Sequence, residues 1–545
     1  MLAPTLRMPY TSHVDRFARE RLPPPHLWPE FRFDLPELQY PERINCGVVL
    51  LDDAIHEGHG ERVALYSDSG VWTYAQLLER ANRIANVLVN EMGIVPGNRV
   101  LLRGPNNPTL VACWLAVMKA GAIAVTTMPL LRAPELSVIA ERAQIDHALC
   151  DWRFAQELEQ AAQLGGRLKR IVCYGSSAGD GQLEGMMNGQ ASTFDNVDTA
   201  RDDVCLLAFT SGTTGTPKAT MHFHRDVLAM REVVAGHLLE TAPDDIYVGS
   251  PPLGFTFGLG ALLVFPLGRR AATLLVEQPS PDNLLSAVQR FRATALFTSP
   301  TAYRSLLPIL EKFDISSLER CVSAGEALPK ATSDAWFAAT KMRLIDGIGA
   351  TELIHIFISA KGEQIRPGTT GKPLPGYQAC ILDPDGLPLP PGKVGRLAVK
   401  GPTGCRYLDD PRQRDYVVHG WNVTGDLYSQ DEDGYFRFEA RADDMIISAG
   451  YNIAGPEVEA ALLQHPAVHE CAVIGVPDEA RGQLVKAFIV LQEGIAGSPE
   501  LVQTLQDFVK QTIAPYKYPR ALEFRDSLPK TATGKLQRHA LRPPK

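Results

Sequence analysis

The stretch Thr210-Ser211-Gly212-Thr213-Thr214-Gly215-Thr216-Pro217-Lys218 follows an apolar strand that we expect over residues 204–209. Its glycines permit positive φ and allow a ligand to approach the backbone closely. Hydroxyl groups and exposed backbone N–H groups in such a loop can surround phosphate oxygens, and Lys218 adds a positive charge at its exit. The spacing does not fit the Walker pattern GxxxxGK[ST], so the sequence predicts a phosphate-binding loop of another kind.

Helix and strand patterns alternate on the N-terminal side of this loop. Thr73 and Gln76 form a capping-box pattern ahead of a helix with its apolar stripe at Leu77, Ala81, Ile84, Ala85 and Leu88. Short apolar strands are expected over residues 100–102 and 122–126, with Asn106 opening the helix between them. Continued alternation predicts an α/β domain with a mostly parallel sheet, preceded by an irregular lead-in over residues 1–70.

The composition changes after about residue 367, where glycine and proline become frequent and the expected strands become short. We expect an antiparallel β region there, with strands near 395–400 and 434–438, completing a large domain. After a polar joint over 441–451, helices at 456–463 and 501–512 and strands at 471–476 and 487–491 predict a small α+β lobe. The predicted domains are therefore residues 1–442 and 443–545.

Composition narrows the classes of protein. The formal net charge of −8 argues against a broad nucleic-acid footprint, and the nine cysteines are dispersed without a CxxC pair. We expect reduced thiols in a cytoplasmic protein, and no zinc site of the paired-cysteine type. Charged residues such as Arg7 and Asp15 interrupt any signal-peptide pattern, and Lys119 interrupts the most apolar run at 110–131. This run therefore reads as a buried helix feeding a strand, without membrane insertion.

Four further segments carry chemistry. Asp346-Gly347-Ile348-Gly349-Ala350-Thr351-Glu352 ends in a carboxylate, which is a hard oxygen ligand of the kind that magnesium prefers. Thr424-Gly425-Asp426 offers a bidentate acceptor suited to a diol. Residues 441–452 form a polar, glycine-containing joint, and Pro529-Lys530-Thr531-Ala532-Thr533-Gly534-Lys535 places a lysine in a polar loop near the end.

In this order, the segments resemble the motifs of the adenylate-forming superfamily, which includes acyl- and aryl-CoA synthetases, and the resemblance runs from about residue 60 to the C-terminus. It implies a large α/β domain with a distorted β-barrel region and a small mobile C-terminal domain. It also implies that Thr351 contacts the α-phosphate of ATP, that Glu352 helps to hold Mg²⁺, and that Lys535 is catalytic. The implied ATP-binding set is Thr210, Ser211, Gly212, Thr213, Thr214, Gly215, Lys218, Gly325, Glu326, Ala327, Asp346, Gly347, Ile348, Gly349, Thr351, Asp426, Arg441 and Lys535.

The same resemblance makes coenzyme A the expected co-substrate. Asp443 corresponds to the hinge, and Gly450 to the wall of the thiol channel, flanked by Ser448, Ala449 and Tyr451. The chain departs from the family pattern at three positions. Ile348 replaces a frequent aromatic residue beside adenine, Ala440 replaces a glycine, and Ser448 replaces a lysine.

The acid substrate is predicted from residues around 251–260 and after Glu352. Phe255, Phe257 and His355 suggest a flat aromatic-walled slot, with Gly258, Ala324 and Gly349 beside it. Such a slot favours an aryl acid over a long flexible chain. The residues at 323–329 and 346–357 resemble the benzoate-CoA ligase branch, and N-terminal segments around Trp28 and at 127–132 are most similar to 2-aminobenzoate-CoA ligases.

The sequence thus predicts an ATP-dependent aryl-CoA ligase, working on small molecules as a monomer or homodimer. The alternatives are an adenylating enzyme that loads a carrier protein, a synthetase for a non-aromatic acid, a nucleotide-binding sensor without catalysis, and a luciferase-like oxidase. The absence of an appended carrier segment favours CoA, and the presence of both Glu352 and Lys535 disfavours a sensor.

Overall fold

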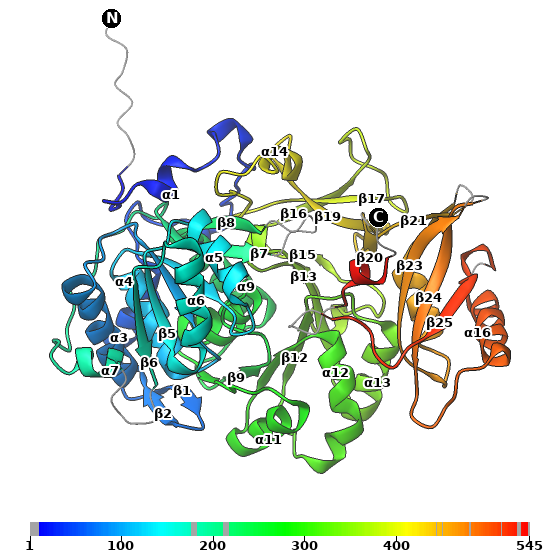
Figure 1. Ribbon diagram of the computed structural model, residues 1–545, viewed down its shortest axis with the longest axis horizontal. Helices are drawn as coiled ribbons and strands as arrows, with labels where there is room; N and C mark the ends of the chain where they lie inside the picture. Colours follow the sequence, from blue (N-terminus) through cyan, green and yellow to red (C-terminus); the bar gives the residue numbers. More distant parts are fainter. Residues whose placement is uncertain are drawn as a thin grey trace, which may run out of the picture.

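The computed structural model describes residues 10–175, 182–210, 217–442, 444–448, 451–478, 481–513, 515–530 and 536–542. These residues form four β-sheets with helices packed around them (Figure 1). Two of the sheets are mostly parallel and belong to the larger body, a third is antiparallel, and the fourth lies in a smaller C-terminal body.

The largest sheet is parallel from β13 through β1 and has antiparallel strands at both edges. Its order is β15 (Lys372–Pro373), β14 (Ile356–Ser359), β13 (Leu344–Gly349), β12 (Arg320–Ala324), β11 (Ala295–Thr298), β9 (Ile246–Gly249), β10 (Ala272–Leu274), β1 (Val63–Ser67) and β2 (Gly70–Thr73).

The second sheet is parallel except at β8, which pairs antiparallel with β7. Its order is β6 (Arg170–Tyr174), β5 (His147–Asp151), β3 (Arg99–Arg103), β4 (Ile123–Thr127), β7 (Val204–Thr210) and β8 (Lys218–Phe223). The strands expected at 100–102, 122–126 and 204–209 are therefore confirmed. The single parallel sheet of the sequence prediction is in fact two.

Helices cover both sheets of the larger body. They are α1 (Phe17–Glu20), α2 (Asp53–His56), α3 (Tyr74–Asn86), α4 (Pro108–Lys119), α5 (Ala133–Arg142), α6 (Ala155–Gly165), α7 (Gln182–Met187), α8 (His224–Met230), α9 (Thr256–Leu259), α10 (Phe265–Gly268), α11 (Pro281–Phe291), α12 (Pro300–Leu306), α13 (Lys330–Thr340) and α14 (Gln413–Tyr416). The chain stays helical between α9 and α10, over Gly260–Val264.

The predicted capping box begins α3. Gln76 donates its backbone N–H to Thr73 Oγ1 at 3.2 Å, and its side chain accepts the N–H of Thr73 at 3.0 Å. The apolar stripe that includes Leu77 and Ile84 is buried. Satisfied N-terminal donors and a buried stripe explain why this segment is helical.

Helix α4 is the buried helix expected from the apolar run. It contacts strands of both parallel sheets and is buried from Leu110 to Lys119. The Lys119 ammonium is fully buried and is neutralised by Asp52, with an Nζ to Oδ1 distance of 2.5 Å. No helix among the described residues has the length and apolarity needed to cross a membrane.

Two local predictions were wrong. The lead-in is not wholly irregular, because Val63–Ser67 forms β1 and pairs in parallel with β10, some two hundred residues later. The helix after β3 is capped by Asn107, whose Oδ1 accepts the N–H of Leu110 at 2.9 Å. Asn106, which was expected to begin this helix, bonds to the carbonyl of Pro251 instead. Pro108 at the first helical position fits Asn107 as the cap, since proline needs no donor there.

The antiparallel region predicted after residue 367 is confirmed. It has the order β16 (Gln378–Leu382), β17 (Val394–Lys400), β19 (Trp421–Gln430) and β18 (Val417–Val418), and β20 (Phe436–Arg441) pairs with β19. All of these pairs are antiparallel.

The C-terminal body has its own apolar cores, distinct from those of the larger body. It contains β21 (Ile446–Ser448), β22 (Tyr451–Ile453), α15 (Gly455–Leu462), β23 (Val468–Asp478), β24 (Gly482–Leu491), α16 (Pro499–Thr512) and β25 (Ala521–Phe524). Figure 1 shows this body beside the larger one, in orange and red. The α+β lobe expected from the sequence is thus present.

Candidate active site

A cavity of about 680 Å³ lies where strands of the two parallel sheets end. Strands β9, β11, β12 and β13 all end at its border, and β3 and β4 approach it from the other sheet. The residues that line the cavity follow these ends directly, among them Asn106, Met128, Ser250 and Ser299. In α/β folds, ligands bind outside the carboxyl ends of parallel strands, so the topology marks this cavity as the site.

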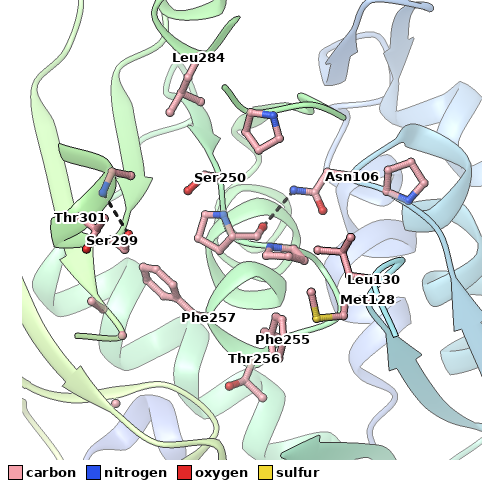
Figure 2. A pocket seen from close by; sticks show the side chains of 18 of the residues that line it. Asn106, Met128, Leu130, Ser250, Phe255, Thr256, Phe257, Leu284, Ser299 and Thr301 are labelled. Atoms are coloured by element: carbon pink, nitrogen blue, oxygen red, sulfur yellow. Dashed lines mark hydrogen bonds between the residues drawn. The ribbon is translucent and has the colours of Figure 1, made fainter. Parts of the chain in front are cut away.

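The cavity wall is mainly apolar, with hydroxyl groups on one side (Figure 2). Phe257 of α9 and Leu284 of α11 border the cavity, and Met128 and Leu130, which follow strand β4, border it from the second parallel sheet. Ser299 and Thr301 lie together at the start of α12. An apolar wall with a few placed polar groups is typical of a small-molecule site.

The Asn106 side chain holds the loop that forms one wall of the cavity through two hydrogen bonds. Its Nδ2 donates to the Pro251 carbonyl at 3.0 Å, and its Oδ1 accepts the N–H of Leu253 at 2.8 Å. The side chain is buried, so both groups are satisfied by the loop that leads to Phe255 and Phe257. The residue expected to open a helix therefore fixes the aromatic wall instead.

Most residues predicted for the acid slot come together here. Phe255, Phe257, Ala324, Gly349 and His355 all line the cavity.

Gly258 is not among the lining residues. A Cβ at this position would lie 2.1 Å from the Pro252 carbonyl oxygen, so the missing side chain allows close backbone packing under the wall.

His355 is the polar group inside the aromatic part. Its ring is 3% exposed and contacts the rings of Phe257 and Phe265, with centroids 5.6 and 4.6 Å away. Nε2 lies 3.3 Å from the Phe257 carbonyl oxygen. Burial lowers the pKa of His355 to about 3, so the imidazole is neutral at pH 7.

A helical turn, Thr351–Leu353, carries the predicted Thr351 and Glu352. Tyr407 donates its hydroxyl hydrogen to Glu352 Oε1, and Lys218 Nζ donates to the Tyr407 oxygen at 3.3 Å. Burial and the Glu352 carboxylate raise the pKa of Tyr407 well above its ordinary value, which keeps it a donor. Sequence reasoning missed Tyr407, because a lone tyrosine carries no motif.

The turn continues through a strained residue. Ile354 is fully buried and has a φ of +66° and a ψ of −37°. A β-branched residue with positive φ is an outlier, and such strain persists where the surrounding structure fixes it. The strained residue connects Glu352 to His355, so one rigid turn sets the places of both.

A buried network of one hydrogen bond and two ionic contacts supports the turn Thr351–Leu353. His222 Nε2 donates to the Thr351 carbonyl at 2.8 Å, and its Nδ1 lies 3.8 Å from Asp226 Oδ2. Asp226 also pairs with Arg406, and all three side chains are fully buried. None of the three was singled out in the sequence, because they lie within or beside strands without a recognisable motif.

The residues predicted to surround adenine lie at the ends of β12 and β13, next to the turn Thr351–Leu353. Gly325 lines the cavity with a φ of +91°, and Glu326 Oε2 accepts from Thr301 Oγ1 at 2.7 Å. Burial raises the pKa of Asp346 to about 8, and its Oδ1 has no hydrogen-bond partner among the described residues. Ala327, Gly347 and Ile348 belong to the same two strand ends but do not line the cavity.

Asp426 and Arg441 are brought together across the β19–β20 pair. Arg441 Nη1 donates to Asp426 Oδ1 at 3.0 Å. Burial raises the pKa of Asp426, while Arg441 opposes that rise.

Several predicted residues lie outside the described part of the chain, namely Ser211, Gly212, Thr213, Thr214, Gly215, Asp443, Ala449, Gly450 and Lys535. Thr210 ends β7, Ser448 is buried in β21, and Tyr451 begins β22.

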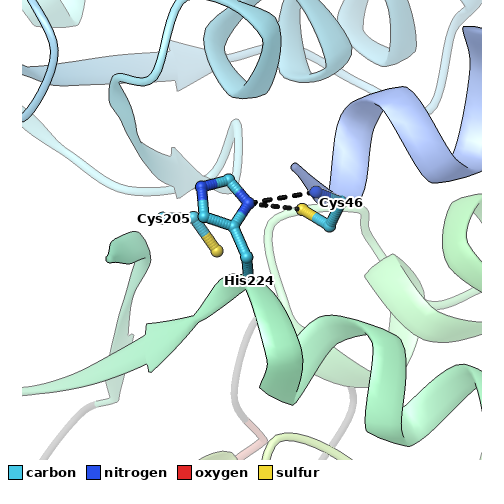
Figure 3. A group of neighbouring side chains, drawn as sticks. All are labelled: Cys46, Cys205 and His224. Atoms are coloured by element: carbon cyan, nitrogen blue, oxygen red, sulfur yellow. Dashed lines mark hydrogen bonds between the residues drawn. The ribbon is translucent and has the colours of Figure 1, made fainter. Parts of the chain in front are cut away.

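A second cluster lies apart from these residues, around His224 (Figure 3). Cys46, Cys205 and His224 are buried together, with one donor atom of each within 4.8 Å of the others. His224 Nδ1 accepts the backbone N–H of Cys46 at 3.1 Å and lies 3.2 Å from its Sγ. The bond from Cys46 N–H to His224 Nδ1 joins the N-terminal segment to α8. All nine cysteines are free, as expected.

Comparison with known proteins identifies the family. Residues 52–406 match the AMP-binding enzyme family, and residues 457–535 match the AMP-binding enzyme C-terminal domain. The chain belongs to the AMP-binding enzyme family. It is 35% identical to a benzoate–CoA ligase of Thauera aromatica over 520 residues, which cover 93% of this chain and 97% of that protein.

Solved structures of similar proteins agree. An anthranilate CoA ligase, AuaEII, in complex with anthranoyl-AMP is 34% identical with a TM-score of 0.88, covering 93% of this chain and 98% of that one. A benzoate CoA ligase from Burkholderia xenovorans LB400 is 31% identical with a TM-score of 0.84, covering 92% and 100%.

The predicted membership of the adenylate-forming superfamily, in its benzoate–CoA branch, is thereby confirmed, as is the fold class. The enzyme is an AMP-forming acid–thiol ligase. ATP, Mg²⁺ and CoA are the co-substrates and cofactor of this class, as the sequence predicted.

Proposed function

We propose that this protein is an ATP-dependent aryl-CoA ligase for an aromatic acid of the 2-aminobenzoate or benzoate type. The acid and ATP form an aryl-adenylate and diphosphate, and CoA then displaces AMP to give aryl-CoA. One observation carries the proposal. The aromatic-walled cavity at the strand ends adjoins the turn that holds Thr351 and Glu352.

The residues at the turn fit a magnesium ion. Glu352 offers a hard anionic oxygen that Tyr407 already orients, and magnesium is usually held by one or two carboxylates together with phosphates. When bound, the ion neutralises charge on the phosphate oxygens. Lys218, hydrogen-bonded to Tyr407, adds a second positive charge near Glu352. Thr351 would contact the α-phosphate.

Polar groups beside the turn suit the nucleoside. The Asp426 carboxylate is a bidentate acceptor for the ribose hydroxyls, and Arg441 orients it. With its pKa raised to about 8, Asp346 is protonated at pH 7 and offers both a donor and an acceptor at the adenine edge, where Gly325, Glu326, Ala327, Ile348 and Gly349 would enclose the base.

The acid end supports an aromatic substrate. Phe257 and His355 present rings to the cavity, and Asn106 holds the loop that carries Phe257. Flat rings stack well on a flat acid, whereas a flexible chain loses more conformational entropy in such a slot. The named relatives act on benzoate and anthranilate, which supports the same class here.

We further propose that residues 1–442 and 443–545 are the two domains, with the hinge at Asp443. Lys535 would stabilise the charge that develops on the α-phosphate during adenylation. Ser448, Ala449, Gly450 and Tyr451 would line the CoA channel. One lobe then serves two half-reactions in turn, which requires reorientation at the hinge.

The test is CoA-dependent AMP release across benzoate, 2-aminobenzoate, 2-hydroxybenzoate and octanoate, with acid-dependent pyrophosphate exchange measured in parallel. We expect both activities, with the benzoates far ahead of octanoate. A preference for octanoate would refute the aromatic slot. Pyrophosphate exchange without any CoA-dependent AMP release would instead favour an enzyme that loads a carrier protein.

A further inference from the structure

Tyr407 donates a hydrogen bond to Glu352, and its own position is set by the chain around it. The backbone of residues 406–408 pairs with β8, where the N–H of Met221 donates to the Arg406 carbonyl at 2.7 Å. Two buried side chains add to this backbone pairing. Each of them connects the segment to the N-terminal part of the chain.

Gln413 makes the first connection. It begins α14, and its side chain is 2% exposed. Its Oε1 accepts the N–H of Tyr407 at 2.8 Å, while its Nε2 donates to the Leu27 carbonyl at 2.9 Å. Since a buried donor left without a partner costs free energy, a shift of the backbone at residue 407 is opposed by both ends of this amide.

Arg406 makes the second connection. Its guanidinium is fully buried and pairs with Asp226. Its Cζ lies 3.9 Å from the ring centroid of Phe223, and 4.8 and 5.8 Å from those of Phe31 and Trp28. Burial lowers the pKa of Arg406 and the Asp226 carboxylate opposes that fall. Rings and an ion pair together therefore restrain the residue that immediately precedes Tyr407.

These contacts come from residues 27–33, which we call the N-terminal strap. Phe31 forms a parallel bridge with Gly401, and the N–H of the next residue donates to the Gly401 carbonyl at 3.0 Å. Glu30 pairs with Lys400, with 2.5 Å between Oε2 and Nζ. The strap is thus held along residues 400–413, the stretch that contains Tyr407.

We propose that the N-terminal strap positions Tyr407, and through it Glu352, with Gln413 and Arg406 as the connecting residues. This inference rests on the proposed function, in which Glu352 helps to hold Mg²⁺. A displaced Tyr407 hydroxyl makes a longer and less linear hydrogen bond to the carboxylate. The carboxylate is then free to turn away from the geometry that Mg²⁺ demands, so binding of Mg²⁺ and ATP weakens.

The experiment titrates Mg²⁺ and ATP in acid-dependent pyrophosphate exchange, with Gln413→Leu as the main variant. Leucine has a similar volume but leaves the Tyr407 N–H and the Leu27 carbonyl without their partner. We expect the Mg²⁺ and ATP requirements to rise roughly fivefold, the scale of a lost neutral hydrogen bond. The KM for the acid and the ranking of acids should not change.

Variants of the strap keep the test independent of any folding defect in Gln413→Leu. Phe31→Leu removes a ring from Arg406 but retains an apolar side chain, and should raise both requirements about twofold, as for a weak cation–π contact. Phe31→Tyr retains the ring and should match the unaltered enzyme. The control is Gln39→Leu. Gln39 donates to the Phe33 carbonyl at 2.8 Å, at the other end of the strap, so its loss should leave both requirements unchanged.

A double-mutant cycle separates positioning from a purely structural role. Gln413→Leu in a Tyr407→Phe background should add little to the Mg²⁺ requirement, because the bond to Glu352 is already absent. A structural role would instead multiply the two effects, and such additive free energies would overturn the inference. Thermal unfolding of each variant reports its stability separately.

The failures are distinguishable. Unchanged Mg²⁺ titrations in Gln413→Leu and Phe31→Leu, while Glu352→Gln raises the Mg²⁺ requirement, would overturn the role of the strap and leave the proposed function standing. An unchanged titration in Glu352→Gln would overturn the proposed magnesium role of Glu352, and the role of the strap with it. A changed ranking of acids in Gln413→Leu would also overturn the inference, since the strap would then act beyond the nucleotide end.

Discussion

The two ends of the cavity are built on different principles. At the nucleotide end, Glu352, Tyr407 and Lys218 are joined by hydrogen bonds, and His222 holds the same turn from below. At the acid end, the walls are mainly rings and aliphatic side chains with a few hydroxyl groups, and the buried Nδ1 of His355 has no hydrogen-bond partner among the described residues. The turn at the nucleotide end is fixed by hydrogen bonds within the protein, although Asp346 Oδ1 close to it has no partner among the described residues, whereas the acid end is shaped mainly by apolar packing.

This difference teaches where specificity lies. Phosphates and a cation are common to every reaction of this class, so a fixed charged frame serves them. The acid varies, and an apolar slot separates acids mainly by shape. Variants at one end should therefore change ATP and magnesium kinetics, and variants at the other should change the ranking of acids.

The largest effect is expected for a substitution that impairs only the nucleotide end. Lys535→Ala should slow adenylation by about 10²-fold or more, because one charge-stabilising donor is lost in the transition state. Thioester formation from a supplied aryl-AMP should be nearly intact, and the ranking of acids should not change. Single-turnover assays of each half-reaction measure this.

The matched control is Lys530→Ala, since Lys530 pairs with Glu470 at 2.7 Å. Equal damage to both half-reactions in Lys535→Ala would contradict a role limited to adenylation.

A smaller effect is expected at Tyr407. Tyr407→Phe removes the hydrogen bond that orients Glu352, and should raise the magnesium and ATP requirements by roughly 10-fold, as for a lost bond to a charged group. The control is Tyr416→Phe. Tyr416 packs edge-on against Tyr407 with centroids 5.8 Å apart, and its buried hydroxyl has no partner among the described residues. Magnesium titrations that match the wild type in both variants would remove Tyr407 from the support of Glu352.

The next effect tests the network below the turn. His222→Phe removes the donor to the Thr351 carbonyl and should raise the KM for ATP by roughly fivefold, the scale of one neutral hydrogen bond. Acid selectivity should stay constant. Thr220→Val is the control on the same strand, because its buried hydroxyl makes no hydrogen bond within the described chain. A change in the ranking of acids would mean that the two ends are not separate.

The sequence located the segment 346–352 through its spacing but not the contacts that support it, and the reason is physical. The segment 346–352 runs from the carboxyl end of β13 into the turn Thr351–Leu353, so its glycine-rich pattern after an apolar start places it at the strand end. Tyr407 and His222 act through single contacts with residues about 55 and 129 positions away in the chain, and no local pattern reports such contacts. Asn106 and Asn107 illustrate the same limit, because only the fold decides which amide caps the helix.

The acid slot shows the limit most clearly. Phe255, Phe257 and His355 were predicted as its walls, and they do line the cavity. The role of the His355 ring depends on the Phe257 carbonyl and on the space left by Gly260, neither of which a linear pattern contains. β1 was missed for a related reason, since five residues paired with a distant strand carry a weak local signal.

An effect as small as that of His222→Phe is expected at the acid end for Gly260→Ala. Gly260 has a helical φ of −61°, so alanine suits the backbone, but its Cβ would lie 2.5 Å from the His355 ring. Displacing the ring should lower kcat/KM for 2-aminobenzoate by roughly fivefold, about the 1 kcal/mol of mild overpacking, with an unchanged KM for ATP. Gly185→Ala is the control, because a Cβ there meets nothing within 4 Å. Asparagine has no atoms where Cδ2 and Nε2 lie, so in a His355→Asn background only the contact with Phe265 Cζ at 2.8 Å remains, and the same glycine change should have a smaller effect. This double-mutant cycle isolates the contact between residues 260 and 355. Additive losses would show that Gly260 acts through the helix and not through the ring of His355.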